Sequence, residues 1–190
     1  MTASRRLPIV GGAIAGIVSW VAGYVLTYLV VASEVRDSPL HRIVEALGGE
    51  PATYEIVGWV FYNAHLVDTV IQDVPLVGSH ATTYIGGEDG FTMVLYAIPI
   101  ASLLLAGIAL AAAWGVSDVT EGTLVGITVL PGYLIASVAG VVLFEVTVGG
   151  ASGAPDFLAG VVLAGIAYPL LVAGAGGLLV GLFRGRGRRQ

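Results

Sequence analysis

The sequence predicts an all-α integral membrane four-helix bundle with an extracytoplasmic amphipathic helical cap. Of its 190 residues, 56% are hydrophobic and only 11% are charged, and the mean hydropathy is +0.91. Soluble domains carry about 25% charged residues, so this chain has too little charge to cover a water-facing surface. Its long apolar runs exceed the roughly 20 residues that cross the hydrocarbon core of a bilayer. Lipid offers no partner for an unpaired backbone group, so each run is expected to be a helix.

Four runs satisfy this length within a single membrane domain, 1–190. The first is too long for the apolar part of a signal peptide, which has about 7–15 residues, and we expect it to be a retained anchor. The expected spans are 7–32, 91–114, 123–146 and 157–183.

Arginine placement predicts the topology. Arg5 and Arg6 precede the first span, and a run of arginines from Arg184 to Arg189 follows the last one. The positive-inside rule therefore places both termini in the cytoplasm, which requires an even number of spans. A fifth span at 58–70 would break this parity, so residues 33–90 are expected to form one extracytoplasmic insertion, which holds nine of the thirteen acidic residues and all three histidines.

A short helix is expected at the start of the insertion. Ser38 can cap its N-terminus, Pro39 fits the first turn, and Gly48 marks the stop. Its apolar residues recur three and four apart and form one face, which consists of Leu40, Ile43, Val44 and Leu47.

A second helix, from about 51 to 72, is expected to be amphipathic and to lie on the membrane surface or on the top of the bundle. Trp59 and Tyr62 would point toward the interface. Its polar face would consist of His65, Asp68, Thr69 and Gln72, and its apolar face of Ile56, Val60, Val67, Val70 and Ile71.

Asn63 is the only asparagine and falls on this apolar face. A buried amide needs hydrogen-bond partners, so one hypothesis is that Asn63 anchors the cap to the bundle through a backbone carbonyl, Tyr28, Tyr133 or Glu145. The alternative is that the helix is rolled and exposes Asn63 to water.

An outside polar cluster of His65, Asp68 and Glu145 is a second candidate site. The three histidines and nearby carboxylates have the chemistry of a zinc site, but no HxH, HxxxH or HExxH spacing occurs. We therefore expect no metal and favour a solvated acidic face.

A small transporter or channel component is the alternative function. Pro99, Pro131 and Pro169 interrupt three spans as in some transporters, although packing kinks are the favoured explanation. The spans also lack a central charged residue of the kind that a coupled transporter uses. Small residues four apart favour close helix packing, within the chain or between copies; they are Gly12 and Gly16, Gly122 and Gly126, and Ala173, Gly177 and Gly181.

No enzyme class is indicated. Cysteine is absent, and GxSxG, Walker and dinucleotide-binding patterns do not occur. We expect no catalytic residue and no cofactor, and the absence of a basic domain speaks against nucleic acid. The acidic, lysine-free composition favours a high-salt source.

The stretch VRDSPLHRIVEALGGEPATYEIVGWVFYNAHLVDTV (35–70), with the first span, resembles a family of small haloarchaeal multi-pass membrane proteins of unknown function. The resemblance implies a cell-membrane location and supplies no catalytic or ligand residues. We expect a non-enzymatic interaction or accessory protein that acts through its cap. Its expected partners are the lipid bilayer and either another membrane or extracytoplasmic protein or a second copy.

Overall fold

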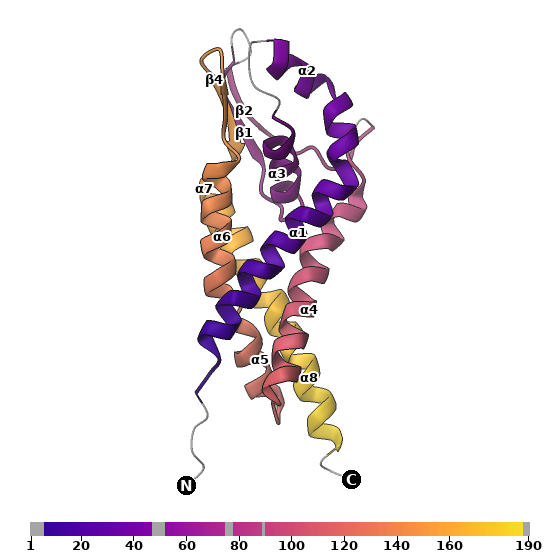
Figure 1. Cartoon of the computed structure of the whole chain (residues 1–190), viewed down its shortest axis with the longest axis vertical. Coiled ribbons are helices and arrows are strands. Elements are labelled where there is room, and N and C mark those ends of the chain that lie inside the picture. Colours follow the sequence, from indigo (N-terminus) through magenta and orange to yellow (C-terminus); the bar gives the residue numbers. More distant parts are fainter. Residues whose placement is uncertain (1–5, 47–51, 75–77, 89, 188–190) are drawn as a thin grey trace.

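The computed structural model describes residues 6–46, 52–74, 78–88 and 90–187. Long helices form an elongated body, and strands and short helices gather at one end of it (Figure 1). We call the described residues within 38–92 and 145–156 the cap. The start of the first helix and the end of the last one lie at the opposite end (Figure 1).

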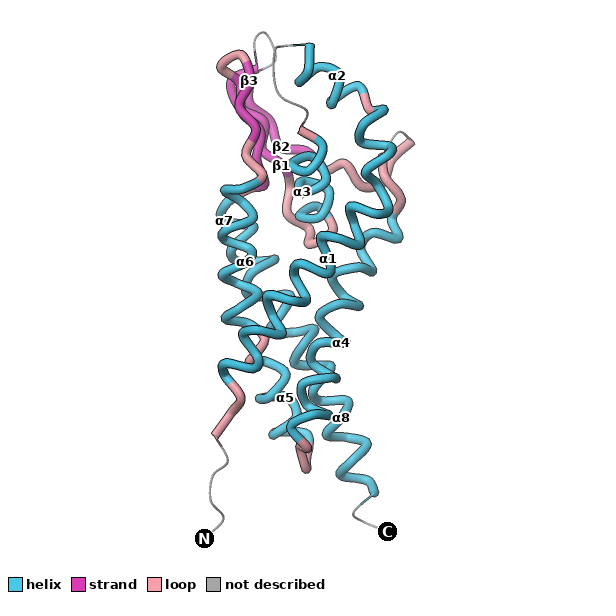
Figure 2. The backbone as a smooth tube through the Cα atoms, viewed as in Figure 1, coloured by secondary structure: helices cyan, strands magenta, loops and turns pink. Residues whose placement is uncertain are grey.

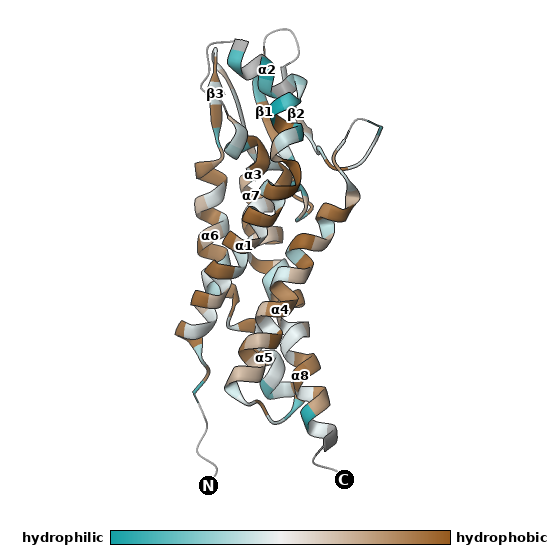
Figure 3. Cartoon of the chain, turned by 45° about the vertical axis from the view of Figure 1, so that its right-hand side comes forward, coloured by the Kyte–Doolittle hydropathy of each residue, from teal (hydrophilic) through white to brown (hydrophobic). Residues whose placement is uncertain are grey.

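Four helices are long and apolar enough to cross a membrane, as predicted. Hydrophobic residues extend along them, while hydrophilic residues gather on α2 and near the end of α8 (Figure 3). The first helix extends further than expected, and the third begins and ends earlier. The four are α1 (Ile9–Asp37); η1 (Met93–Tyr96) with α4 (Ala97–Trp114); α5 (Val119–Ile127) with α6 (Leu130–Leu143); and α7 (Phe157–Ala159) with the π-helical η2 (Gly160–Ala167) and η3 (Pro169–Ala173) and then α8 (Gly174–Gly187).

The prediction of an all-α fold is wrong, because the cap contains a four-stranded antiparallel sheet. The strand order is β2-β1-β4-β3, so two hairpins from distant parts of the chain meet along β1 and β4. Val70 pairs with Ala81 on one side and with Ala154 on the other. The strands are β1 (Thr69–Val74), β2 (Gly78–Thr82), β3 (Val146–Val148) and β4 (Ala151–Pro155).

The prediction of a surface helix over 51–72 is also wrong, both in the length of the helix and in its location. Helix α3 covers only Thr53–Asn63, and every residue from Ile56 to Asn63 is buried. From Ile56 onward it is buried on all sides between α1 and the strands, so it is not amphipathic (Figure 2). Trp59 and Tyr62 are core residues, with 2% and 0% of their surface exposed.

Helix α2 (Pro39–Ala46) confirms the predicted start of the first cap helix. The Ser38 hydroxyl accepts a hydrogen bond from the backbone N–H of His41 at 3.2 Å, as an N-cap does. The predicted stop at Gly48 and the predicted apolar face lie outside the residues and side chains that the structure describes.

Small residues bring the helices close together within this one chain. A Cβ on Gly16 would lie 2.2 Å from the backbone oxygen of Val129, and one on Gly122 would lie 2.3 Å from that of Gly177. Thus α1 packs against the start of α6, and α5 packs against α8. The predicted packing role of these residues is confirmed, with intramolecular partners.

Two of the three predicted proline interruptions coincide with a break or a change of helix type, whereas Pro99 lies in the first turn of α4 and does not interrupt it. Residues 128 and 129 separate α5 from α6, in which Pro131 occupies the first turn. Pro169 begins the second π-helical segment, directly after Tyr168, whose N–H bonds to the oxygen of Leu163, five residues back.

Candidate functional site

Helix α3 and the turn that follows it are held against α6 and its C-cap residue by three hydrogen bonds. The Trp59 indole N–H donates to the Phe144 carbonyl at 2.6 Å, and the Tyr62 hydroxyl donates to the Ser137 carbonyl. The third bond joins His65 to Tyr133. From Phe144 to Tyr133 is eleven residues, or about 16 Å at 1.5 Å per residue. The stretch 58–70 therefore enters the bundle, turns and returns as β1.

His65 lies at the deepest part of this re-entrant stretch and is fully buried. Its Nδ1 lies 2.8 Å from the Phe61 carbonyl oxygen, which can only accept, so Nδ1 carries the proton. Nε2 then accepts a hydrogen bond from the Tyr133 hydroxyl at 2.6 Å. Burial lowers the pKa of His65 to about 4, so its imidazole is neutral near pH 7.

Asn63 is buried, with 2% of its surface exposed, which contradicts the alternative of a rolled, exposed side chain. Its amide N–H groups donate to the Val67 carbonyl at 2.9 Å and to the Thr69 hydroxyl at 3.4 Å. Its oxygen accepts from the Tyr84 backbone N–H at 2.8 Å. All three partners belong to the cap, so these bonds hold the cap's own segments together instead of reaching Tyr28, Tyr133 or Glu145.

The structure does not bring His65 into an outside polar cluster with Asp68 and Glu145. His65 is buried, whereas both carboxylates are exposed. The difference arises because the chain turns after α3 and places His65 inward. Asp68 instead lies beside Asp156, whose backbone N–H donates to the Asp68 carbonyl at 2.9 Å.

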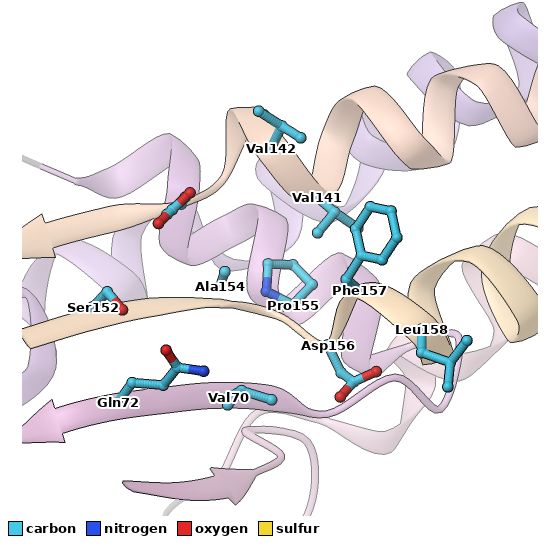
Figure 4. Close-up of a pocket in the computed structure, with 11 residues that line it drawn as sticks. Val70, Gln72, Val141, Val142, Ser152, Ala154, Pro155, Asp156, Phe157 and Leu158 are labelled. Atoms are coloured by element: carbon cyan, nitrogen blue, oxygen red, sulfur yellow. The ribbon is translucent and has the colours of Figure 1, made fainter.

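Glu145 and Asp156 line a groove of about 470 Å³ where the sheet meets the helices (Figure 4). Gln72 and Ser152, which pair across β1 and β4, line its cap side. Phe157 and other apolar side chains of the spans line the opposite side. We call this site the acidic groove. It combines hydrogen-bonding groups and carboxylates with an apolar wall.

Asp156 has a structural task in the acidic groove. Its Oδ1 accepts a hydrogen bond from the backbone N–H of Ala159 at 2.7 Å and caps α7. The sequence placed Gln72 on the polar face of a predicted helix and did not single out Ser152, because the strands that carry these two residues were not predicted. The Gly149-Gly150 pair between two short alternating segments is a hairpin signal that could have revealed β3 and β4.

The three histidines lie in three different environments. His41 contacts the Thr53 hydroxyl at 3.0 Å, His65 lies in the core, and His80 is exposed on β2. Within the described residues, no three histidine or acidic side chains come together in a way that could hold a metal ion.

The model of a family of unknown function, DUF7978, matches residues 1–184, almost the whole chain. The chain belongs to this family. Comparisons with curated proteins and with solved structures gave no match.

Proposed function

We propose that this family member is a non-enzymatic integral membrane protein that binds another membrane protein through the outward face of its cap. We define the outward face as Val70, Gln72, Thr147, Ser152 and Ala154. The four apolar helices support insertion in a membrane, and many of their large apolar side chains are exposed, as lipid contact requires.

The main support for this proposal is that polar side chains gather on one side of the cap sheet, which is the outward face. Pairing places Gln72, Ser152 and Thr147 on the same side of the sheet. The other side packs on α3, where a Cβ on Gly153 would lie 2.7 Å from the Trp59 ring. Because the outward face borders the acidic groove, a partner bound there would contact both the cap and the spans.

The burial of α3 supports the same function. A cap on a flexible tether would change its position relative to the spans, whereas α3 joins the cap to α6 by buried hydrogen bonds. The outward face and the spans thus form one rigid surface, and preorganisation of this kind reduces the entropy lost on binding.

Site-specific photocrosslinking in native membranes tests this function. The chain contains no cysteine, so a photoreactive label can be attached to single cysteines at Gln72 and Thr147. Both should capture the same protein, while a label at the exposed Tyr54 of α3 should not. Capture of lipid alone at both positions, or equal capture from Tyr54, would contradict the proposal.

A transporter component is the second candidate. The re-entrant stretch, the interrupted third span and the π-helical fourth span resemble the discontinuous helices that line transporter sites. Purified protein in vesicles should then change the passage of ions or small solutes across the bilayer. Flux equal to that of protein-free vesicles for all solutes tested would speak against it.

A further inference from the structure

A shallow apolar hollow runs along the exposed face of α6. It has a volume of about 680 Å³, and its lining is wholly apolar: Leu134, Ile135, Val138, Ala139, Val142 and Leu143. Ile135, Val142 and Leu143 each expose about two-thirds of their surface, at 65%, 64% and 65%. From Leu134 to Leu143 the helix rises about 14 Å, or two and a half turns. We call this hollow the α6 seat.

The α6 seat leads directly into the acidic groove, because Val142 lines both. Beyond Val142 the surface changes from apolar to acidic within a few residues, at Glu145 and Asp156. The outer end of the combined surface therefore carries two carboxylates beside the polar Gln72 and Ser152, while the α6 seat consists of aliphatic side chains.

The two carboxylates have no cation beside them in the described part of the chain. Neither Glu145 nor Asp156 forms an ion pair there, and Arg36 contacts the Tyr28 hydroxyl of its own helix. An apolar strip that ends in unneutralised negative charge is complementary to an apolar segment that ends in positive charge.

We infer that the α6 seat and the acidic groove together bind a transmembrane helix of a second membrane protein, with arginine or lysine at the end that lies beside the cap. The inference rests on the proposed function and names the chemistry of the partner. Side chains of the incoming helix would pack among those of α6, and its basic end would lie between Glu145 and Asp156.

Two other occupants fit the surface less well. A second copy related by a two-fold axis would place Glu145 and Asp156 near the same carboxylates of its partner, and like charges repel. An anionic lipid could fill the α6 seat with an acyl chain, but its head group would meet the same carboxylates. The charge pattern of this surface therefore favours a helix with a basic end.

A synthetic helix tests the inference directly. The probe is a peptide of about 21 alternating Leu and Ala residues with two arginines at one end. A matched peptide carries two glutamines instead. Full-length protein labelled with a donor dye at a single cysteine, Ser79→Cys, is placed in nanodiscs of zwitterionic lipid, and energy transfer to an acceptor on the peptide measures binding.

The arginine peptide should bind more tightly than the glutamine peptide, by about fivefold for each ion pair formed. The double variant Glu145→Gln, Asp156→Asn should abolish this preference, because it removes both negative charges. It should keep the fold, because asparagine can still cap α7. Ala139→Trp should weaken the binding of both peptides, because the larger side chain fills the α6 seat. The preference should also decrease as salt screens the charges.

Equal binding of the two peptides, or a preference that survives in the double variant, would overturn the inference. Binding that the Ala139→Trp variant leaves unchanged would do the same for the α6 seat. If crosslinking from Gln72 and Thr147 succeeds while the arginine preference is absent, the proposed function stands and only this partner chemistry fails.

Discussion

At the scale of single residues, Asn63 shows how one side chain organises a loop. Replacing it with leucine should leave the Tyr84 N–H and the Val67 carbonyl without their partners. Each unsatisfied buried group costs about 1–3 kcal/mol, so Asn63→Leu should lower the free energy of unfolding by about 2–6 kcal/mol. Thermal unfolding in detergent measures this change, with the exposed Gln72→Leu as control. Equal effects of the two substitutions would contradict the assigned role.

His65 should make stability depend on pH. The folded protein holds the imidazole with a pKa of about 4, below the ordinary value of about 6.5, so the folded state binds its proton less readily than the unfolded state. The contribution of neutral His65 to the free energy of unfolding is therefore fully present above pH 6.5. It is lost as the pH falls from 6.5 to 4, and the total loss is about 3 kcal/mol. The wild type minus His65→Gln difference in unfolding free energy should follow this course. Parallel pH profiles would show that His65 does not contribute.

The sequence correctly placed Asn63 on a face where its amide needs hydrogen-bond partners, but it assigned His65 to the polar face, and the structure buries it. The helical wheel assumed that one helix continued to residue 72, whereas the chain turns at Leu66, whose φ is 62°. Glycine usually occupies such a left-handed position, so the turn had no local signal. The β-branched Thr69, Val70 and Ile71 did favour a strand.

At the scale of elements, the contact between α3 and the end of α6 depends on Gly58. A Cβ there would lie 2.3 Å from the Phe144 ring. Alanine normally favours a helix by about 1 kcal/mol over glycine, but the steric conflict should outweigh this gain. Gly58→Ala should destabilise the protein by about 1–3 kcal/mol, as overpacking does.

Gly185→Ala in α8 is the matched control, because nothing lies within 4 Å of the added methyl group. Its unfolding temperature should stay the same or rise slightly. Adding Phe144→Leu to Gly58→Ala should restore part of the lost stability if the ring is the obstacle. A loss that is identical with and without Phe144→Leu would point to another cause.

The four long helices were predictable because length and composition alone reveal them, whereas the sheet was not. Residues 69–74 and 151–155 are about 80 positions apart, and their pairing depends on how the spans between them fold back. Val146 completed an apolar run and was therefore assigned to a span. Periodicity describes a single segment and carries no information on a partner strand so distant.

At the scale of the whole molecule, the structure places the start of α1 and the end of α8 at one end and the cap at the other (Figure 1). Arginines flank the ends of these two helices that lie away from the cap, while acidic residues predominate in the cap. If the positive-inside rule applies, the cap lies outside the cell and both termini lie inside.

Single-cysteine labelling in intact cells checks this topology without interference, since the chain has no native cysteine. An impermeant maleimide should label Ser79→Cys and Thr147→Cys from outside, because both positions are exposed in the cap. Ser4→Cys should react only after lysis. The two cap positions come from different hairpins of one sheet, so they must lie on the same side of the membrane. Labelling of Ser4→Cys in intact cells would reverse the orientation and place the acidic groove, with any partner it binds, on the cytoplasmic side.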